Sequence, residues 1–168
     1  TPLFLPQLEG ERAPHWDPDL RGAFLGVSRQ TRIPDFARAV YEGVAFAARQ
    51  ALETLKISAD VDSDIISCGG GGFRSQAWTQ IRADVLNKPL QRLTSGEPGI
   101  SGAVTLAAIG TGIYSNFEEA STALSQYRAP NIPDPEQVKI YASVFEIYKD
   151  AIKANANIGK RLTHLGEG

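Results

Sequence analysis

Four consecutive glycines, Gly69–Gly72, form the most specific local pattern in the sequence. They follow a short apolar segment, 64–68, and precede Trp78, Ile81 and Val85 at helical spacing. A turn without side chains lets its backbone approach a flat or charged ligand, and the following helix directs its N–H groups to the same place. The pattern is typical of a nucleotide-contacting loop. Glycines that merely allow a tight strand-to-helix turn explain it equally well, so both interpretations stay open on spacing alone.

The two best-known phosphate-binding patterns do not fit this turn. A dinucleotide fingerprint needs a third glycine three residues after the second, where this sequence has Arg74 or Ser75. It also needs an acidic residue about twenty residues further on, whereas residues 90–92 read Leu-Gln-Arg. No GxxxxGK[ST] segment occurs, so a P-loop is excluded and an NAD-binding enzyme is disfavoured.

Metal chemistry is not indicated either. The histidines, His15 and His164, lie at opposite ends of the chain, and no CxxC or HxxxH spacing brings ligands together. The single cysteine, Cys68, cannot close an internal disulfide, and no charged-then-apolar leader opens the sequence. These features predict no metal site and a reducing cytoplasm as the compartment.

Composition sets broader limits. The 168 residues contain 17 Lys+Arg and 19 Asp+Glu, for a formal net charge of −2, and 42% are hydrophobic. A globular domain or half of a two-lobed protein is expected, without a basic stripe for nucleic acid and without a membrane span. Because the sequence opens with Thr1 in a Pro-rich, partly apolar segment, we expect a fragment of a longer protein.

The elements that must position the glycine turn follow from periodicity. Residues 1–33 are predicted to be an extended arm rich in Pro and Gly, and 34–114 an α/β core. A long helix over Pro34–Lys56 is expected to bury one face, made of Phe36, Val40, Val44, Ala48, Ala51 and Leu55.

The core of that region is predicted to be a βαβ unit. The segment 64–68, the glycine turn, a helix over Ser75–Asn87 and a second short strand at 89–93 imply a parallel pair of strands. The ligand crevice of such a unit lies at the carboxyl end of the strands, where the glycines are.

A further helix is predicted over Ser101–Gly110, with a smooth face of small residues. We expect Ala103 and Ala107 to pack closely on a sheet, whereas Gly102 could also line the crevice.

Residues 115–168 are predicted to be C-terminal helices. Ser115 and Glu118 have the spacing of a capping box, and Asp134-Pro135 opens a longer helix. That helix carries an apolar stripe of Val138, Tyr141, Phe145, Tyr148 and Ile152. Packing within the same lobe is the preferred interpretation of the stripe, and a homodimer seam is the alternative.

Several segments together carry a family resemblance. The segment 22–27, followed after seven residues by Asp35–Glu42, has the form of a known two-part signature. Before it, 10–18 reads GERAPHWDP and is followed by Arg21-Gly22. After it, 69–86 resembles a GGG-x-RS-xx-W-x-Q-xx-AD stretch, and 97–103 resembles an E-xxxx-GAA stretch, with Ala103-Val104 where the pattern has Ala-Ala. Over about 2–114, the sequence therefore resembles the FGGY carbohydrate kinases, most closely their xylulose kinase members.

The resemblance implies a fold and a role for the glycine turn. The fold would be α/β, of the ribonuclease H-like, actin-like ATPase type, and this chain would be part of the C-terminal lobe. The turn would be the adenosine motif, with the backbone of Gly70, Gly71 and Gly72 against the nucleoside and Ser75 in contact with ATP. Ser75 is equally well placed to cap the next helix.

The resemblance also implies what lies elsewhere. The catalytic base, the phosphate loops and most Mg²⁺ ligands are expected upstream, in or near an N-terminal lobe that partners this one. Asp17 and Asp19 lie in a Pro-rich turn and are not expected to act as bases, and Asp84 is expected to be structural. This chain alone is expected to be inactive. The substrate would be xylulose or a related pentulose, with gluconate, a polyol or a non-catalytic actin-like module as alternatives.

Overall fold

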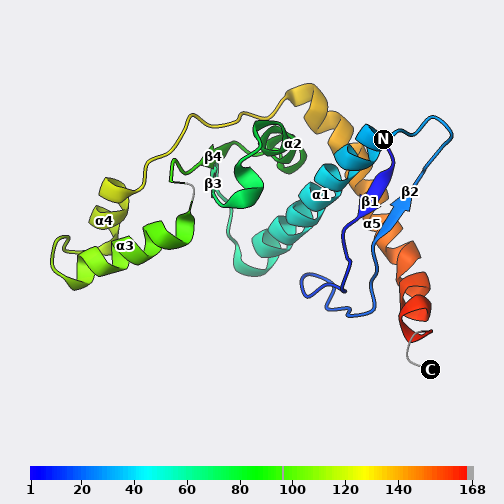
Figure 1. Cartoon of the computed structure of the whole chain (residues 1–168), viewed down its shortest axis with the longest axis horizontal. Coiled ribbons are helices and arrows are strands. Elements are labelled where there is room, and N and C mark those ends of the chain that lie inside the picture. The colour runs from blue at the N-terminus through cyan, green and yellow to red at the C-terminus, as the bar shows by residue number, and fades with distance from the viewer. Residues whose placement is uncertain (96, 166–168) are drawn as a thin grey trace. The chain divides into compact units, whose positions relative to one another are not determined.

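The computed structural model describes residues 1–95 and 97–165, which divide into two compact units (Figure 1). The first unit comprises Thr1–Asp62, Asp84–Asn87 and residues from Asp134 onward, and the second comprises Ser63–Ala83 and Lys88–Pro133. Each unit is described by itself. None of the helices in the described ranges is both long enough and apolar enough to cross a bilayer.

The arm of the first unit contains a small sheet. Strand β1 (Leu3–Leu5) pairs antiparallel with β2 (Ala23–Leu25), so that Phe4 lies opposite Phe24. Three-residue strands are too short to show the alternation that identifies a strand in a sequence, and the arm was therefore expected to be merely extended. The expectation that it lies on other elements is confirmed, because Leu5 is buried and β1 packs on the first long helix.

That helix, α1 (Ile33–Ala59), buries a different face from the predicted one. Its buried residues are Ala39, Glu42, Gly43, Ala45 and Phe46, whereas Ala48, Ala51 and Leu55 are exposed. The reason is the close approach of β1, since a Cβ atom on Gly43 would lie 2.4 Å from the carbonyl oxygen of Phe4. Small residues therefore define the part of this face that meets β1, while Phe46 fills the core beside it.

The C-terminal helix α5 (Pro135–His164) supplies the other half of this core. Asp134 caps it, as predicted, through a bond from the backbone N–H of Glu136 to Oδ1. The ring of Phe46 lies 5.4 Å from that of Tyr148 and 6.0 Å from that of Phe145. The predicted apolar stripe thus packs within its own unit, and the alternative of a homodimer seam stays a prediction.

The second unit contains the predicted βαβ arrangement. Strands β3 (Ile66–Cys68) and β4 (Leu90–Arg92) are parallel, with Ile66 opposite Leu90. Between them, the chain forms the short 3₁₀ turn η1 (Gly71–Phe73) and the helix α2 (Gln76–Leu86). The glycine turn therefore starts at the carboxyl end of β3, as the sequence predicts.

The helix after β4 does not pack as expected. Helix α3 (Pro98–Gly110) buries Thr105 and Ala108, while Ala103 and Ala107 are exposed. The prediction that these two alanines pack on a sheet is wrong, because α3 packs on the next helix, α4 (Phe117–Leu124), through its other side.

The predicted capping box at Ser115 is also wrong by one residue. Asn116 is the cap of α4, and its Oδ1 accepts from the backbone N–H of Glu119 at 2.9 Å. Glu119 accepts from the backbone N–H of Ser115, the residue before the cap, at 3.0 Å, so this bond is not the reciprocal bond of a capping box. Asn and Ser are equally good caps, so the choice depended on where the helix begins.

The contact between β1 and α1 can be tested by Gly43→Ala. Helix propensity alone would make this change stabilising by about 0.5–1 kcal/mol, but overpacking against a rigid backbone carbonyl costs about 1–3 kcal/mol. We therefore expect Gly43→Ala to lower the free energy of unfolding, measured by urea denaturation followed by circular dichroism.

Gly102→Ala in α3 is the matched control. A Cβ atom on Gly102 would meet nothing within 4 Å, so this change is expected to stabilise the protein or leave it unchanged. Stabilisation by both substitutions would show that β1 does not lie against Gly43.

Candidate functional site

Two of the four glycines in the turn, Gly69 and Gly70, have a strong structural reason to be glycine, and Gly72 has a weaker one. Gly70 has φ 90° and ψ 179°, a conformation available essentially to glycine alone. A Cβ atom on Gly69 would lie 2.5 Å from Cγ of Pro98, and one on Gly72 would lie 3.2 Å from Nη1 of Arg82. Much of the turn's glycine content therefore follows from its local geometry.

Gly71 has no such reason. Its φ is not positive, and a Cβ atom added to it would meet nothing within 4 Å. The residue is exposed and begins the 3₁₀ turn. The absence of a side chain here leaves bare backbone at the surface, beside the end of a parallel strand.

Arg82 stabilises the end of the glycine turn. Its Nη1 donates to the carbonyl oxygen of Gly72 at 3.0 Å, and its guanidinium carbon lies 3.8 Å from the ring centroid of Trp78 and 4.4 Å from that of Phe73. The side chain is buried, and this burial lowers the pKa of Arg82. Hydrogen bonding to a charged donor and cation–π contact in a desolvated place are both stronger than their exposed equivalents.

Ser75 has the geometry of a helix cap. Its Oγ accepts from the backbone N–H of Trp78 at 3.3 Å, just before α2 begins, so the capping interpretation is confirmed. Whether it also contacts a nucleotide stays a prediction. Asp84 is structural, as predicted, because its Oδ1 accepts from the backbone N–H of Asp134 at 2.8 Å.

The two aspartates of the arm are also engaged in structure. Asp17 Oδ1 accepts from the backbone N–H of Asp19 at 2.9 Å, which closes a local turn. Asp19 Oδ2 lies 3.6 Å from Nε2 of His164. These contacts agree with the expectation that neither serves as a base.

A hollow of about 180 Å³ adjoins the glycine turn. Gly69 and Gly70 of the turn line it together with Arg74, Arg92 and Arg128. The second unit thus places three arginine residues around this hollow.

The sequence reading attached no role to Arg82, Arg92 or Arg128. A signal for Arg82 does exist, since Trp78 and Arg82 are four residues apart on one helix and therefore neighbours on its surface. For Arg128 there is no local signal. Its position depends on a bond from its backbone N–H to the carbonyl oxygen of Arg92 at 2.8 Å.

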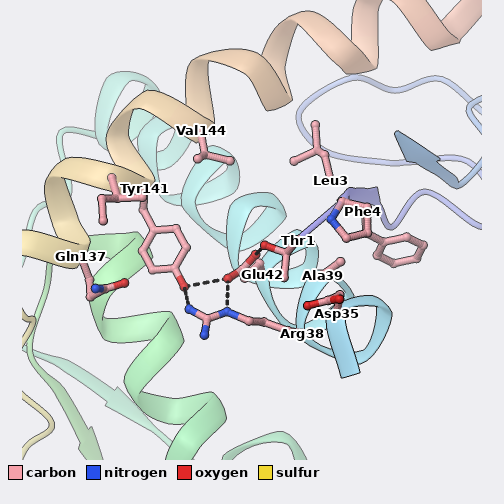
Figure 2. A pocket seen from close by; sticks show the side chains of 12 residues that line it. Thr1, Leu3, Phe4, Asp35, Arg38, Ala39, Glu42, Gln137, Tyr141 and Val144 are labelled. Carbon is pink, nitrogen blue, oxygen red and sulfur yellow. Dashed lines mark hydrogen bonds and ion pairs between the residues drawn. The ribbon is translucent and has the colours of Figure 1, made fainter. Parts of the chain in front are cut away.

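The first unit contains a larger hollow, of about 450 Å³, between β1, α1 and α5 (Figure 2). In it, Arg38, Glu42 and Tyr141 point toward one another. Arg38 Nε lies 2.7 Å from Glu42 Oε1, and the hydroxyl of Tyr141 donates to the same oxygen at 2.9 Å. Arg38 Nη2 also donates to that hydroxyl, at 3.2 Å. Because its Oε1 accepts two bonds within this network, we assign Glu42 to structure and not to proton transfer.

Known proteins match this chain clearly. The family model "FGGY family of carbohydrate kinases, C-terminal domain" matches residues 1–111. The xylulose kinase of Lactococcus lactis is 32% identical over 167 residues, which cover 98% of this chain and 33% of that relative. The chain thus spans about a third of the length of the curated relatives it matches.

Two solved structures from Lactobacillus acidophilus are similar to the same extent. A ligand-bound xylulose kinase has a TM-score of 0.81 at 30% identity, covering 92% of this chain and 31% of its own. A gluconate kinase has a TM-score of 0.80 at 30% identity, with the same coverage of 92% and 31%. The predicted resemblance and the predicted α/β fold of the actin-like ATPase type are both confirmed.

The role of Arg82 can be tested with Arg82→Lys. Lysine keeps the charge but loses the planar group that lies over two rings, so we expect the free energy of unfolding to fall by about 1–3 kcal/mol. Trp78 fluorescence is expected to change as well, because the ring loses its neighbour. Arg74→Lys, at a side chain that is 75% exposed, is the control and is expected to change neither quantity. Equal effects of the two substitutions would contradict the role given to Arg82.

The buried tyrosines of the first unit predict a loss of stability at high pH. Burial raises the pKa of Tyr141 and of Tyr148 to about 12. An unfolded tyrosine titrates near 10, so above about pH 10 the unfolded chain releases protons that the folded chain keeps. Their full stabilising contribution is therefore present below about pH 10 and is lost as the pH rises toward 12.

Urea denaturation at pH 9, 10 and 11 measures this loss. For Tyr148 the slope is expected to reach up to about 1.4 kcal/mol per pH unit, and Tyr148→Phe should remove that part of it. Tyr127→Phe, at an exposed side chain, is the control for loss of a hydroxyl. Parallel pH profiles for the wild type and Tyr148→Phe would show that this phenol does not couple to folding.

Proposed function

This chain belongs to the FGGY family of carbohydrate kinases, and we propose that it is the nucleotide-facing part of the second lobe of an ATP-dependent kinase that phosphorylates a sugar hydroxyl. The activity, the substrates and the partners belong to a protein about three times as long, by the length of its relatives. The proposal concerns what this part contributes to that protein.

The bare backbone at Gly71 is the observation that carries the proposal. It lies just past the carboxyl end of β3, where parallel α/β sheets bind ligands. The positive φ of Gly70 sets the direction of this backbone, and the hydrogen bond from Arg82 to the carbonyl of Gly72 stabilises it. A preformed flat surface without side chains suits the adenine and ribose of ATP, with Gly70, Gly71 and Gly72 as the contacting residues and Ser75 close behind them.

Chemistry at the phosphates is proposed to come from the rest of the protein. Phosphoryl transfer depends on positioning and on charge stabilisation by a base, cations and Mg²⁺. The carboxylates of Asp17, Glu42 and Asp84 take part in structural hydrogen bonds within this chain. A catalytic base, the phosphate loops and the Mg²⁺ ligands would then lie mainly in the remaining two thirds, including an N-terminal lobe.

The sugar is proposed to be xylulose or a related pentulose. The support is the xylulose kinase of Lactococcus lactis, which aligns with nearly the whole chain. Gluconate is the second candidate, because the gluconate kinase of Lactobacillus acidophilus is as similar in structure as the xylulose kinase of the same organism. Assay of the complete protein with xylulose, gluconate and glycerol distinguishes these candidates, and no sugar-dependent ATP consumption at all would favour a non-catalytic actin-like module.

The glycine surface is tested by Gly71→Val in the complete kinase. A branched side chain would stand between the backbone and the nucleotide, so we expect the KM for ATP to rise about tenfold or more, equivalent to about 1.4 kcal/mol of binding. The KM for the sugar should stay within about twofold of the wild type. Steady-state kinetics with each substrate varied in turn measure both constants.

Gly110→Val is the matched control for this test. Gly110 lies at the end of α3, and an added Cβ atom would meet nothing within 4 Å there either. This substitution is expected to leave both constants unchanged. If Gly71→Val instead damages the two constants equally, the glycine turn is not the nucleoside site.

A further inference from the structure

The hollow beside the glycine turn collects positive charge from three separate segments. Arg74 follows the turn η1, Arg92 ends β4, and Arg128 lies in the stretch after α4. We propose that this hollow is a binding site for a phosphate-class anion, distinct from the bare backbone that would face the nucleoside.

The three guanidinium groups are only partly neutralised. Arg74 Nη2 lies 3.2 Å from Glu97 Oε1, but both side chains are well exposed, so this ion pair is weak. The side chain of Arg128 has no partner among the residues that the structure describes. Three arginines thus line one small space, and the carboxylate that pairs with Arg74 is not itself part of the lining.

Arg92 adds a more specific observation. Its Nη1 donates to the carbonyl oxygen of Phe73 at 3.2 Å, and its Nη2 bonds Oε1 of Gln76. Both partners are neutral acceptors. Its Nε is buried and has no hydrogen-bond partner among the described residues. Because both bonded partners are neutral, they leave the positive charge of this guanidinium uncompensated.

The size of the hollow limits the ligand. Its volume of about 180 Å³ is below the range of roughly 300–1,000 Å³ that holds a whole small-molecule ligand. A single phosphate group fits this size, and arginine forks match its oxygens in geometry as well as in charge. Thr94 and Ser95 belong to the same lining; the Thr94 hydroxyl donates to the carbonyl oxygen of Gln126 at 2.7 Å, and the Ser95 hydroxyl is bonded to that of Ser101 at 2.7 Å.

Two sources can supply this chemistry. The group can be a phosphate of the nucleotide that lies on the glycine turn, an assignment that rests on the proposed function. It can also be a separate anion, either inorganic phosphate or the phosphate of another metabolite, and that assignment does not depend on nucleotide binding. The same site serves both, and competition separates them.

The test is isothermal titration calorimetry of the 168-residue chain with inorganic phosphate, adenosine and ADP as separate probes. We expect phosphate to bind and Arg128→Gln to weaken its binding about tenfold, while adenosine binding stays unchanged. The exposed Arg128 side chain can be replaced without loss of the backbone bond to Arg92. Arg29→Gln, at an exposed arginine of the first unit, is the charge-matched control and should leave phosphate binding unchanged.

The outcomes are separable. Phosphate that competes with ADP but not with adenosine supports a nucleotide phosphate in the hollow, and phosphate that competes with neither supports a separate anion. Absence of phosphate binding, or equal weakening by Arg128→Gln and Arg29→Gln, overturns the site. Phosphate binding without any adenosine binding overturns the proposed nucleoside surface but leaves the anion site standing.

Discussion

The guanidinium of Arg82 donates to the carbonyl of Gly72 while it lies over the rings of Phe73 and Trp78. A run of glycines loses more conformational entropy on ordering than any other sequence, so a glycine turn is rigid only if something external fixes it. Arg82 reaches the turn from the helix that follows it and fixes its last glycine. The shape of the candidate nucleoside surface therefore depends on one buried cation.

The family signature in the first unit marks structure more than chemistry. Asp35 accepts from the backbone N–H of Arg32 at 2.8 Å and so closes the start of α1. Glu42 joins Arg38 to Tyr141 and thereby ties α1 to α5. Gly43, which directly follows the signature, lets the carbonyl of Phe4 come close. The buried carboxylate of Glu42 is tolerated here because it is paired with Arg38 and accepts a hydrogen bond from Tyr141. The residues that identify the family in this region are those that keep three elements together.

Features set by residues close together in the sequence could be predicted, whereas features set by contacts between distant residues could not. The parallel βαβ unit, its glycine turn and the cap at Asp134 are encoded by neighbouring residues, and all were predicted correctly. The buried face of α1 was not, because hydropathy gives weight to Val40 and Leu55 and none to Gly43, whose importance comes from a distant carbonyl. The prediction for Ala103 and Ala107 was wrong for a related reason. A helix face made of small residues shows that close packing is allowed but not that a partner is present. The cluster around Arg92 joins residues far apart in sequence, and no local pattern encodes it.

The four glycines of the turn differ in how much of their presence the fold itself explains. Before the structure, a tight turn explained all of them as well as a ligand did. Gly70 is now explained by its backbone conformation and Gly69 by the proximity of Pro98, while the guanidinium of Arg82 limits the room for a side chain at Gly72. Gly71 is left without an internal cause, although its neighbours fix it in place at the edge where parallel strands bind ligands. Folding alone would accept a side chain at this position, so Gly71, and not its neighbours, is where the proposed nucleoside contact separates from the structural requirements of the turn.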